Sequence, residues 1–379
     1  MAGPGSVRAA TLLGPEKIEV RSYSRLEQAE LGDDWGLLRV EACGLCGTDV
    51  EQFHGGFVGS TWPAGPVVPG HEVVGVVESV GPEAAARWGV APGDRVAVEP
   101  NLPCGTCAWC LSGRYVSCQG WSPAPMAYGF IPVAHPPGLW GGWSELMVLH
   151  PRSVVHRVPD GLDAGTAALF NAFANGFRWA TTLAGLRYGQ SVLVLGAGQR
   201  GLACVAAARA AGAGLIVATG RSTDAHRLEA ARALGADVTV DVDAAGPAGD
   251  VEAAVREATG GALVDVAIDA SAGATAPVLQ ALACVRPEGT VVLAGLKGGR
   301  TVDGVPVDDL VLRGLRVVGA RSADFEAYEQ ALAYLAAATD RVAPLRTHEL
   351  PLDRAETALR VLAGEAPDEH PIYVSLRIP

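Results

Sequence analysis

The chain has 379 residues, a length that suggests roughly two domains. Hydrophobic residues make up 49% of it, and 41 acidic against 29 basic residues leave a net charge of −12 at pH 7. Because this balance is acidic and the basic residues form no block, the composition argues against nucleic acid and anionic membranes as partners.

The amino terminus and the cysteines indicate the compartment. The first residues contain no apolar stretch of the kind that forms the core of a signal sequence. The eight cysteines have the pattern of metal ligands plus buried thiols, which a reducing compartment permits. We therefore expect a cytoplasmic protein.

Short strands are predicted for residues 1–163, which are rich in glycine, proline and valine. Alternating runs such as Val73–Val80 and Arg95–Glu99 are separated by Pro-Gly and Gly-Asp turns. This pattern predicts a β-rich, barrel-like domain. Residues 336–379 return to short strands, and we expect them to rejoin this domain.

Two short motifs in this first domain combine cysteine, histidine and carboxylate side chains. One contains Cys46, Thr48 and Asp49, and the other contains His71 and Glu72. Such groups suit zinc, and an open fourth position would let the metal polarise an alcohol or carbonyl oxygen. Thr48 would hydrogen-bond that oxygen and relay its proton, and Asp49 would orient His71. The alternative is a purely structural pair of His71 and Glu72.

Four closely spaced cysteines follow with the spacing C-x2-C-x2-C-x7-C. They are Cys104, Cys107, Cys110 and Cys118. Four thiolates so close in sequence predict one tetrahedral zinc ion with no open position, which would stabilise a lobe and take no part in chemistry. The alternatives are disulfides, which need an oxidising compartment, and an iron–sulfur cluster, whose common spacing differs.

The segment 119–143 is rich in large apolar side chains and prolines. These side chains belong to Trp121, Met126, Tyr128, Phe130, Trp140 and Trp143. Either the segment walls a substrate pocket, together with Phe53, Phe57 and Trp62, or it packs on the lobe or at a subunit contact. Because no cluster of Arg or Lys lies near the motifs, we expect an uncharged, medium-sized secondary alcohol or ketone as substrate.

From residue 164 to residue 335, Ala-rich helical patterns alternate with short apolar strands. The expected strands are 191–195, 215–218, 265–269 and 290–294. Strand–helix alternation predicts βαβ units, and hence an α/β domain with a doubly wound parallel sheet.

A glycine-rich motif follows the first of these strands and opens a helix. It contains, in order, Gly196, Gly198, Gln199, Arg200 and Gly201. Gly196 permits a tight turn, and Gly198 lets the backbone approach a pyrophosphate at the helix N-terminus. Gly201 allows the helix to pack closely on the strand. The alternative is a glycine turn that binds no nucleotide.

The residues at the end of the second strand indicate whether the cofactor is NAD or NADP. An acidic residue normally holds the ribose hydroxyls of NAD there, but this chain has Gly220, followed by Arg221 and Ser222. Without the carboxylate a 2′-phosphate is not repelled, and Arg221, Ser222 and Arg227 would bind it. We therefore predict NADP in preference to NAD. The alternative is NAD, with Arg221 merely solvated and the ribose bound by Thr219 or Asp224.

The order of these motifs resembles that of the zinc-dependent medium-chain alcohol dehydrogenases, in particular the threonine and polyol dehydrogenase branch. The matching elements are G-x-C-G-T-D, P-G-H-E-x-x-G, P-G-D-x-V, the four-cysteine lobe, a G-G-W-S-E-L segment and G-A-G-x-x-G. The resemblance implies a GroES-like catalytic domain formed by residues 1–163 and 336–379, with the structural zinc lobe at about 100–120. It implies a Rossmann dinucleotide-binding domain at 164–335.

The resemblance also implies an activity, which is the NAD(P)-dependent interconversion of an alcohol and a carbonyl compound by hydride transfer. By match, Cys46 and His71 would be ligands of a catalytic zinc ion and Thr48 the proton relay. A homodimer or homotetramer is expected, with edge strands of the cofactor domain near Thr290–Gly319 as the contact.

One position departs from the family pattern. The third zinc ligand is usually a cysteine or carboxylate where this chain has Asn171, and Glu72 would then move in as a ligand. If Glu72 does not, the chain is a family member without catalytic zinc that reduces an activated C=C or C=N bond. A nucleotide-sensing protein on the same scaffold is the non-enzymatic alternative. Glu51 stands where many relatives carry histidine, and His54 lies nearby.

Overall fold

The computed structural model describes residues 5–57, 65–120, 126–366 and 368–379. The chain divides into two compact units, one formed by Met1–Asn171 with Leu332–Pro379 and the other by Ala172–Ala331. Both ends of the chain therefore belong to the same unit.

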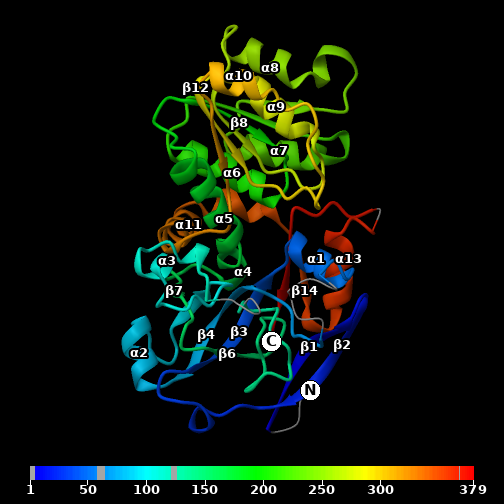
Figure 1. Cartoon of the computed structure of the whole chain (residues 1–379). Coiled ribbons are helices and arrows are strands. Elements are labelled where there is room, and N and C mark those ends of the chain that lie inside the picture. Colours follow the sequence, from blue (N-terminus) through cyan, green and yellow to red (C-terminus); the bar gives the residue numbers. More distant parts are fainter. Residues whose placement is uncertain (1–4, 58–64, 121–125, 367) are drawn as a thin grey trace. The chain divides into compact units, whose positions relative to one another are not determined.

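The unit Ala172–Ala331 is built on a six-stranded parallel sheet (Figure 1). Its strands are β8 (Ser191–Leu195), β9 (Leu215–Gly220), β10 (Val238–Asp241), β11 (Val264–Asp269), β12 (Val285–Leu293) and β13 (Arg316–Gly319). Across the sheet their order is β10-β9-β8-β11-β12-β13, and every neighbouring pair is parallel. This is the strand order of doubly wound dinucleotide-binding sheets, and it confirms the predicted fold class.

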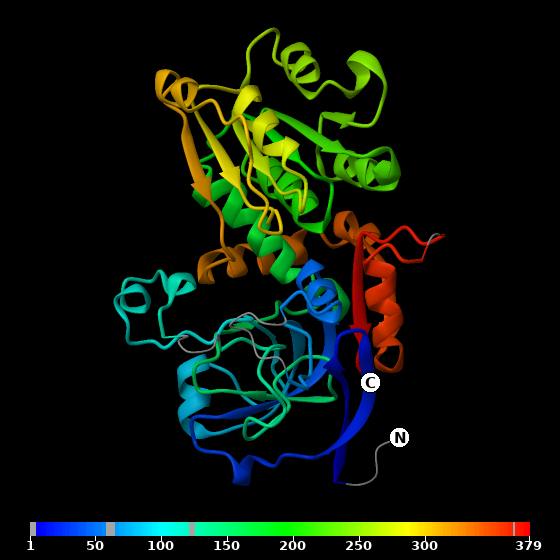
Figure 2. The same cartoon turned by 45° about the vertical axis from the view of Figure 1, so that its right-hand side comes forward.

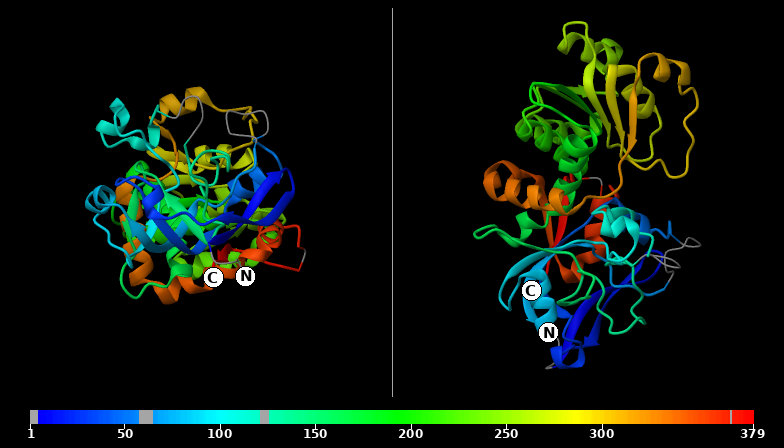
Figure 3. Two further views of the ribbon diagram at one scale, coloured as in Figure 1. Left: turned by 90° about the horizontal axis from the view of Figure 1, so that it is seen from below. Right: turned by 60° about the vertical axis from the view of Figure 1, so that its left-hand side comes forward.

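Helices connect these strands. They are α6 (Gln199–Ala210), α7 (Ala225–Leu234), α8 (Val251–Ala258), α9 (Ala276–Cys284) and α10 (Val307–Leu312). Central strand residues such as Leu193, Val217 and Ile268 have no exposed surface. Because helices cover both faces of such a sheet, its strands are continuous apolar runs. Strand β13 lies at one edge of the sheet (Figure 3, orange).

The unit made of the two chain ends is β-rich. Its strands are β1 (Ser6–Gly14), β2 (Lys17–Ser24), β3 (Gly36–Gly44), β4 (Glu72–Val80), β5 (Arg95–Val98), β6 (Leu146–Leu149), β7 (Val155–Arg157), β14 (Arg346–Pro351) and β15 (Tyr373–Arg377). One sheet has the order β14-β15-β3-β4-β5-β7, with β6 also paired to β3, and β1 and β2 form a separate ribbon. Strand β15, from the carboxyl end, pairs with β3, so the last strand of the chain belongs to this unit.

Short helices complete the β-rich unit. They are α1 (Gly47–Phe53), α2 (Pro82–Trp88), α3 (Ala108–Leu111), α4 (Ala164–Ala167), α12 (Thr339–Val342) and α13 (Ala355–Leu362). Helix α13 lies beside β15 (Figure 2). Helices α5 (Phe170–Phe177) and α11 (Phe325–Ala337) contain the boundaries between the two units. In the described part of the chain, no helix is both long enough and apolar enough to cross a membrane.

Candidate functional site

The glycine-rich motif forms a tight turn between β8 and α6. Gly196 has φ +102°, a conformation that favours glycine, and a Cβ there would lie 3.1 Å from Ser271 Cα. A Cβ on Gly201 would lie 1.8 Å from the Gly196 carbonyl oxygen. Gly198 caps α6, and Gln199 and Arg200 are its first two residues. The motif therefore has the turn and the close packing expected for a pyrophosphate site at a helix N-terminus.

Carboxylates surround the residues expected to bind a 2′-phosphate. Arg221 Nε lies 3.0 Å from Asp243 Oδ2, and the Ser222 hydroxyl donates to Asp241 Oδ2 at 2.6 Å. Asp241 ends β10, the parallel neighbour of β9. The sequence argument missed Asp241 and Asp243, although the carboxyl ends of neighbouring parallel strands always meet at one edge of a sheet. Arg221 keeps 70% of its side chain exposed.

Arg227 has a carboxylate partner as well. Its Nη1 donates to Asp224 Oδ1 at 2.9 Å, one turn earlier along the chain. Asp224 Oδ2 also accepts a hydrogen bond from the Arg221 backbone N–H at 3.1 Å. A 2′-phosphate at this edge would therefore have to compete with carboxylates for both guanidinium groups.

In the β-rich unit, Cys46, Asp49 and His71 form a buried group whose potential ligand atoms all lie within 4.8 Å of one another. Cys46 Sγ lies 3.3 Å from His71 Nε2. Ligand bonds of ordinary length place sulfur and nitrogen about 3.6 Å apart around tetrahedral zinc. The donor atoms are therefore spaced as a zinc ion requires, and the pair fits the metal.

Local structure brings these three side chains together. Cys46 is the N-cap of α1, and its backbone N–H donates to Asp49 Oδ2 at 2.8 Å. Asp49 Oδ1 lies 3.2 Å from His71 Nδ1. Gly70, directly before His71, has φ +93°, and a Cβ there would lie 2.3 Å from the Trp143 ring. A larger residue at position 70 would therefore collide with the Trp143 ring.

The His71 imidazole lies between two acidic partners. Burial by itself lowers the pKa of His71, but the Asp49 carboxylate and the Cys46 sulfur raise that pKa well above its usual value. The acidic partners of His71 thus stabilise a positive charge at this position, between Cys46 and His71. A divalent cation supplies such a charge and displaces the proton.

Glu72 is oriented by Asn171 and Tyr373, and it is not a member of this three-residue group. Its Oε1 accepts a hydrogen bond from Asn171 Nδ2 at 2.8 Å. The Tyr373 hydroxyl lies 3.4 Å from its Oε2 and donates to the Ala168 carbonyl oxygen at 2.5 Å. All three side chains are buried. Gly44 makes room for them, because a Cβ there would lie 1.9 Å from the Tyr373 hydroxyl. No pattern in the sequence pointed to Tyr373, which is 301 residues from Glu72.

Thr48 and His54 differ in their surroundings. The Thr48 backbone N–H donates to Cys46 Sγ at 3.3 Å, and its side chain is partly exposed beside the cluster. His54 lies between Glu16 and Glu365, with a ring nitrogen 3.0 Å from a carboxylate on each side. His54 is therefore a surface histidine with acidic partners.

The aromatic segment has two roles. Tyr128, Trp140 and Trp143 are at most 1% exposed and belong to the core of the β-rich unit, which favours the packing interpretation for these residues. Phe130 differs, because its ring centroid lies 5.5 Å from that of His71 and 6.0 Å from that of Phe57. These two phenylalanines form an apolar wall beside the cluster. Trp62 and Trp121 lie outside the described residues.

The four closely spaced cysteines also converge. Their sulfur atoms lie within 4.8 Å of one another. Cys110 Sγ is 3.9 Å from that of Cys104 and 3.6 Å from that of Cys107. Tetrahedral zinc–thiolate bonds place sulfurs about 3.8 Å apart, whereas a disulfide needs about 2.05 Å. The geometry therefore fits a four-thiolate metal site and excludes disulfides among these cysteines.

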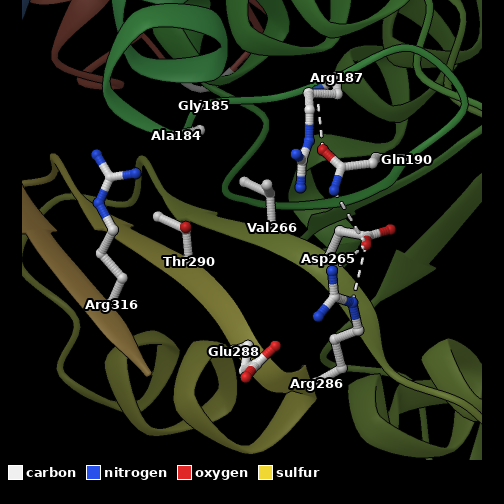
Figure 4. A pocket seen from close by; sticks show the side chains of 10 residues that line it. All are labelled: Ala184, Gly185, Arg187, Gln190, Asp265, Val266, Arg286, Glu288, Thr290 and Arg316. Atoms are coloured by element: carbon white, nitrogen blue, oxygen red, sulfur yellow. Dashed lines mark hydrogen bonds and ion pairs between the residues drawn. The ribbon is translucent and has the colours of Figure 1, made fainter. Parts of the chain in front are cut away.

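A separate cavity of about 340 Å³ lies in the Rossmann unit (Figure 4). Its charged lining residues include Arg187, Asp265, Arg286 and Arg316, which stand at or before the amino ends of strands. Asp265 accepts hydrogen bonds from Gln190 and Arg286, so several of these groups satisfy one another (Figure 4). Ligands of doubly wound sheets bind at the carboxyl ends of the strands, so this cavity is not the cofactor site.

Comparison with known proteins places these features in a family. Residues 32–160 match the model of the alcohol dehydrogenase GroES-like domain, and residues 201–337 match the model named zinc-binding dehydrogenase. A protein of Mycobacterium tuberculosis H37Rv named as an alcohol dehydrogenase is 45% identical over 375 residues, covering 98% of this chain and 99% of the relative. The chain belongs to the zinc-dependent medium-chain dehydrogenase family. It is therefore an enzyme of the NAD(P)-dependent alcohol dehydrogenase type.

Other members of the family are more distant. The erythritol/L-threitol dehydrogenase of Mycolicibacterium smegmatis is 31% identical and covers 95% of each chain. A solved structure described as a zinc-binding dehydrogenase of Sinorhizobium meliloti 1021, bound to NADP, is 29% identical. It has a TM-score of 0.82 and covers 98% of this chain and 99% of its own. The family resemblance inferred from the motifs is thus confirmed.

Proposed function

We propose that this protein interconverts a secondary alcohol and a ketone or aldehyde by hydride transfer with NADP(H). The observation that carries the proposal is the buried group of Cys46, Asp49 and His71, whose spacing suits one zinc ion. Residues 1–163 and 336–379 form the catalytic domain in this proposal, and residues 164–335 bind the dinucleotide.

The catalytic zinc ligands in this proposal are Cys46, His71 and Glu72. Zinc held there supplies polarisation of the substrate C–O bond. In this proposal Asn171 is a support and not a ligand, because its amide nitrogen donates to Glu72 Oε1 at 2.8 Å. It orients the Glu72 carboxylate, which takes the place of the ligand that the family usually has at position 171.

The remaining residues orient substrate and protons. Asp49 holds the His71 ring, since its carboxylate lies 3.2 Å from Nδ1. Thr48 presents its hydroxyl to the substrate oxygen and takes or returns the proton. Phe57 and Phe130 exclude water beside His71 and favour an uncharged, apolar substituent on the substrate.

NADP(H) is preferred in the proposal because Gly220 ends β9 without a carboxylate and Arg221 is 70% exposed. The pyrophosphate binds at Gly196, Gly198 and Gly201. The family member solved with NADP supports a nicotinamide cofactor. NAD(H) is the second candidate, because Asp241 and Asp243 lie beside Ser222 and Arg221.

A homodimer or homotetramer is also proposed. Strand β13 is an unpaired edge of the described sheet, and four exposed apolar side chains lie on it and on α10. These are Val307, Val311, Leu312 and Val317. Burying an apolar patch and a strand edge against a second copy removes both from water. None of the eight cysteines is in a disulfide, which fits a reducing cytoplasm.

The test combines metal analysis with activity. Protein purified without chelator is analysed for zinc per chain and screened with secondary alcohols and ketones in the presence of NADP(H) and NAD(H). We expect about two zinc ions per chain, one for each cysteine-containing site, and turnover with NADP(H). One zinc ion together with reduction of activated C=C or C=N compounds would replace this proposal by a metal-independent reduction.

A further inference from the structure

Lys297 links two loops at the carboxyl edge of the parallel sheet. Its ammonium lies 2.7 Å from Asp269 Oδ2 and donates to the Ser271 carbonyl oxygen at 2.7 Å. Asp269, the last residue of β11, is fully buried, and the Lys297 side chain is only 12% exposed. Ser271 itself donates to Asp269 Oδ1 from its backbone N–H at 3.1 Å and from its hydroxyl at 2.5 Å. We call Lys297, Asp269 and Ser271 the lysine clamp.

Further bonds join the same two loops. The Gly273 N–H donates to the Leu296 carbonyl oxygen at 2.8 Å, and Arg300 donates to the Gly273 carbonyl oxygen. A Cβ on Gly295 would lie 1.8 Å from the Ser271 carbonyl oxygen, so the two backbones touch. The loop after β11 and the loop after β12 therefore form one fixed surface around the clamp.

This surface lies at the point where the strand order reverses. Strands β8 and β11 are neighbours in the sheet although β9 and β10 come between them in the chain, and ligands of such sheets bind outside the carboxyl ends at that point. The clamp adjoins the dinucleotide turn, since a Cβ on Gly196 would lie 3.1 Å from Ser271 Cα. The adenosine half is directed toward the end of β9, so the other half extends over β11 and β12.

One exposed apolar side chain suits this surface to an aromatic ring. Leu296, between Gly295 and Lys297, is 81% exposed, and an exposed leucine at this edge offers an apolar face.

Lys17 and Lys297 are the only lysines in the chain, among 29 basic residues. A compact ammonium fits between the converging oxygens of Asp269 and Ser271, whereas a planar guanidinium would push the two loops apart.

We propose that Lys297 is a positioning residue for the nicotinamide half of the cofactor. Its ammonium is occupied by Asp269 and Ser271 and acts through the two loops that it joins. These loops offer their backbone groups and Leu296 to the nicotinamide ring and its ribose. The inference rests on the proposed function, because it requires a nicotinamide dinucleotide.

The test compares complete and truncated cofactors. Dissociation constants are measured by tryptophan fluorescence for NADPH and NADH, and for ADP-ribose and its 2′-phosphate, which lack nicotinamide. In Lys297→Met we expect dissociation constants about tenfold higher for the complete dinucleotides, because the two loops lose the ion pair that fixes them. The truncated ligands should bind as they do to the unmodified protein. Lys17→Met is the matched control, because Lys17 is exposed on β2, and should change nothing.

A second variant separates positioning from charge compensation. Lys297→Met leaves Asp269 as an unpaired buried charge and so could impair folding; Lys297→Met with Asp269→Asn removes both charges. The double variant should melt near the unmodified protein and still bind NADPH and NADH weakly. Binding restored in the double variant, or equal weakening of complete and truncated ligands, would overturn the inference. Unmodified protein that binds no dinucleotide would overturn the proposed function instead, and this inference with it.

Discussion

The side chain of Asn171 acts through its hydrogen-bond partner, Glu72. Its Nδ2 donates to Glu72 Oε1 at 2.8 Å, while the Tyr373 hydroxyl contacts the other carboxylate oxygen at 3.4 Å. A carboxylate that a neighbouring side chain hydrogen-bonds is fixed in position. In the proposed function, single buried residues of this kind determine whether the cluster of Cys46 and His71 has a third ligand.

Glu72→Gln should cost the protein its catalytic zinc. A neutral amide is a weaker zinc ligand than a carboxylate, so zinc should fall from about two ions per chain to about one after dialysis against a mild chelator. The turnover number should fall by roughly 100-fold. Elemental analysis and steady-state kinetics measure both. Glu83→Gln, at an exposed position of α2, should keep both zinc ions. If Glu72→Gln also keeps two, Glu72 is not a ligand.

Arg221 and Asp243 should act in opposite directions on cofactor choice. Arg221→Ala removes the guanidinium proposed to bind the 2′-phosphate, so KM for NADP should rise by about tenfold, with little change for NAD. Asp243→Asn frees Arg221 from its 3.0 Å ion pair and should lower KM for NADP. Initial rates with both cofactors measure the effect. Equal changes for NAD and NADP in the Arg221 variant would exclude a role in 2′-phosphate binding.

At the scale of elements, the zinc lobe depends on metal and on a buried contact. Its one regular helix, α3, has four residues. The lobe residue Tyr115 donates to Glu99 Oε1 at 2.6 Å, and His156 Nε2 lies 3.0 Å from the same oxygen. Glu99 and His156 are both buried in the β-rich unit. Because so short a segment buries little apolar surface, metal binding and this contact must supply most of its stability.

Cys110→Ser should remove the structural zinc and leave the catalytic one. The thiolate at Cys110 is one of four ligands, so zinc should fall to about one ion per chain. The free energy of unfolding should fall by more than about 3 kcal/mol, as expected when a structural metal is lost. Urea denaturation followed by tryptophan fluorescence measures the change.

A companion variant isolates the buried contact. Tyr115→Phe should keep two zinc ions and lower the free energy of unfolding by about 1–3 kcal/mol, because Glu99 loses a charge-assisted hydrogen bond. A Cys110→Ser protein as stable as the unmodified one would mean that the lobe is held by packing alone.

At the scale of the whole molecule, charge and exposed apolar surface have different consequences. The net charge of −12 favours solubility and disfavours acidic partners. The patch on α10 and β13 is an exception to this polar surface, because Leu312 is 85% exposed and Val311 73%. An apolar patch beside an unpaired strand edge is typical of an interface between subunits.

Leu312→Glu combined with Val311→Glu should dissociate the oligomer. Charged side chains at the centre of an apolar contact are left without partners on association, which costs several kcal/mol per charge (on the order of 2–5). Light scattering coupled to size exclusion would then report the mass of one chain. Tyr188→Ser, at a side chain that is 90% exposed elsewhere in the same unit, is the control and should not change the mass. An unmodified protein that is already monomeric would refute the proposed assembly.

Local patterns in the sequence determined the fold class and the donor groups. The apolar run 191–195 and the glycines from Gly196 to Gly201 predict a strand, a turn and a helix because each depends on neighbouring residues alone. The same holds for the four clustered cysteines. Tertiary structure decided the surroundings of these groups. Tyr373 reaches Glu72 only because β15 pairs with β3, and Asp243 meets Arg221 only because β10 lies beside β9.

Lys297 illustrates the same division. Nothing in its neighbourhood in the sequence distinguishes it from a solvated loop residue. Its role depends on the parallel pairing of β11 with β12, which brings the loop after β12 next to the loop after β11. Sequence determines which groups are present and which elements carry them. The energy of a buried charge depends on partners that only the folded sheet brings within hydrogen-bond distance, and for this reason the tertiary structure decided the sites.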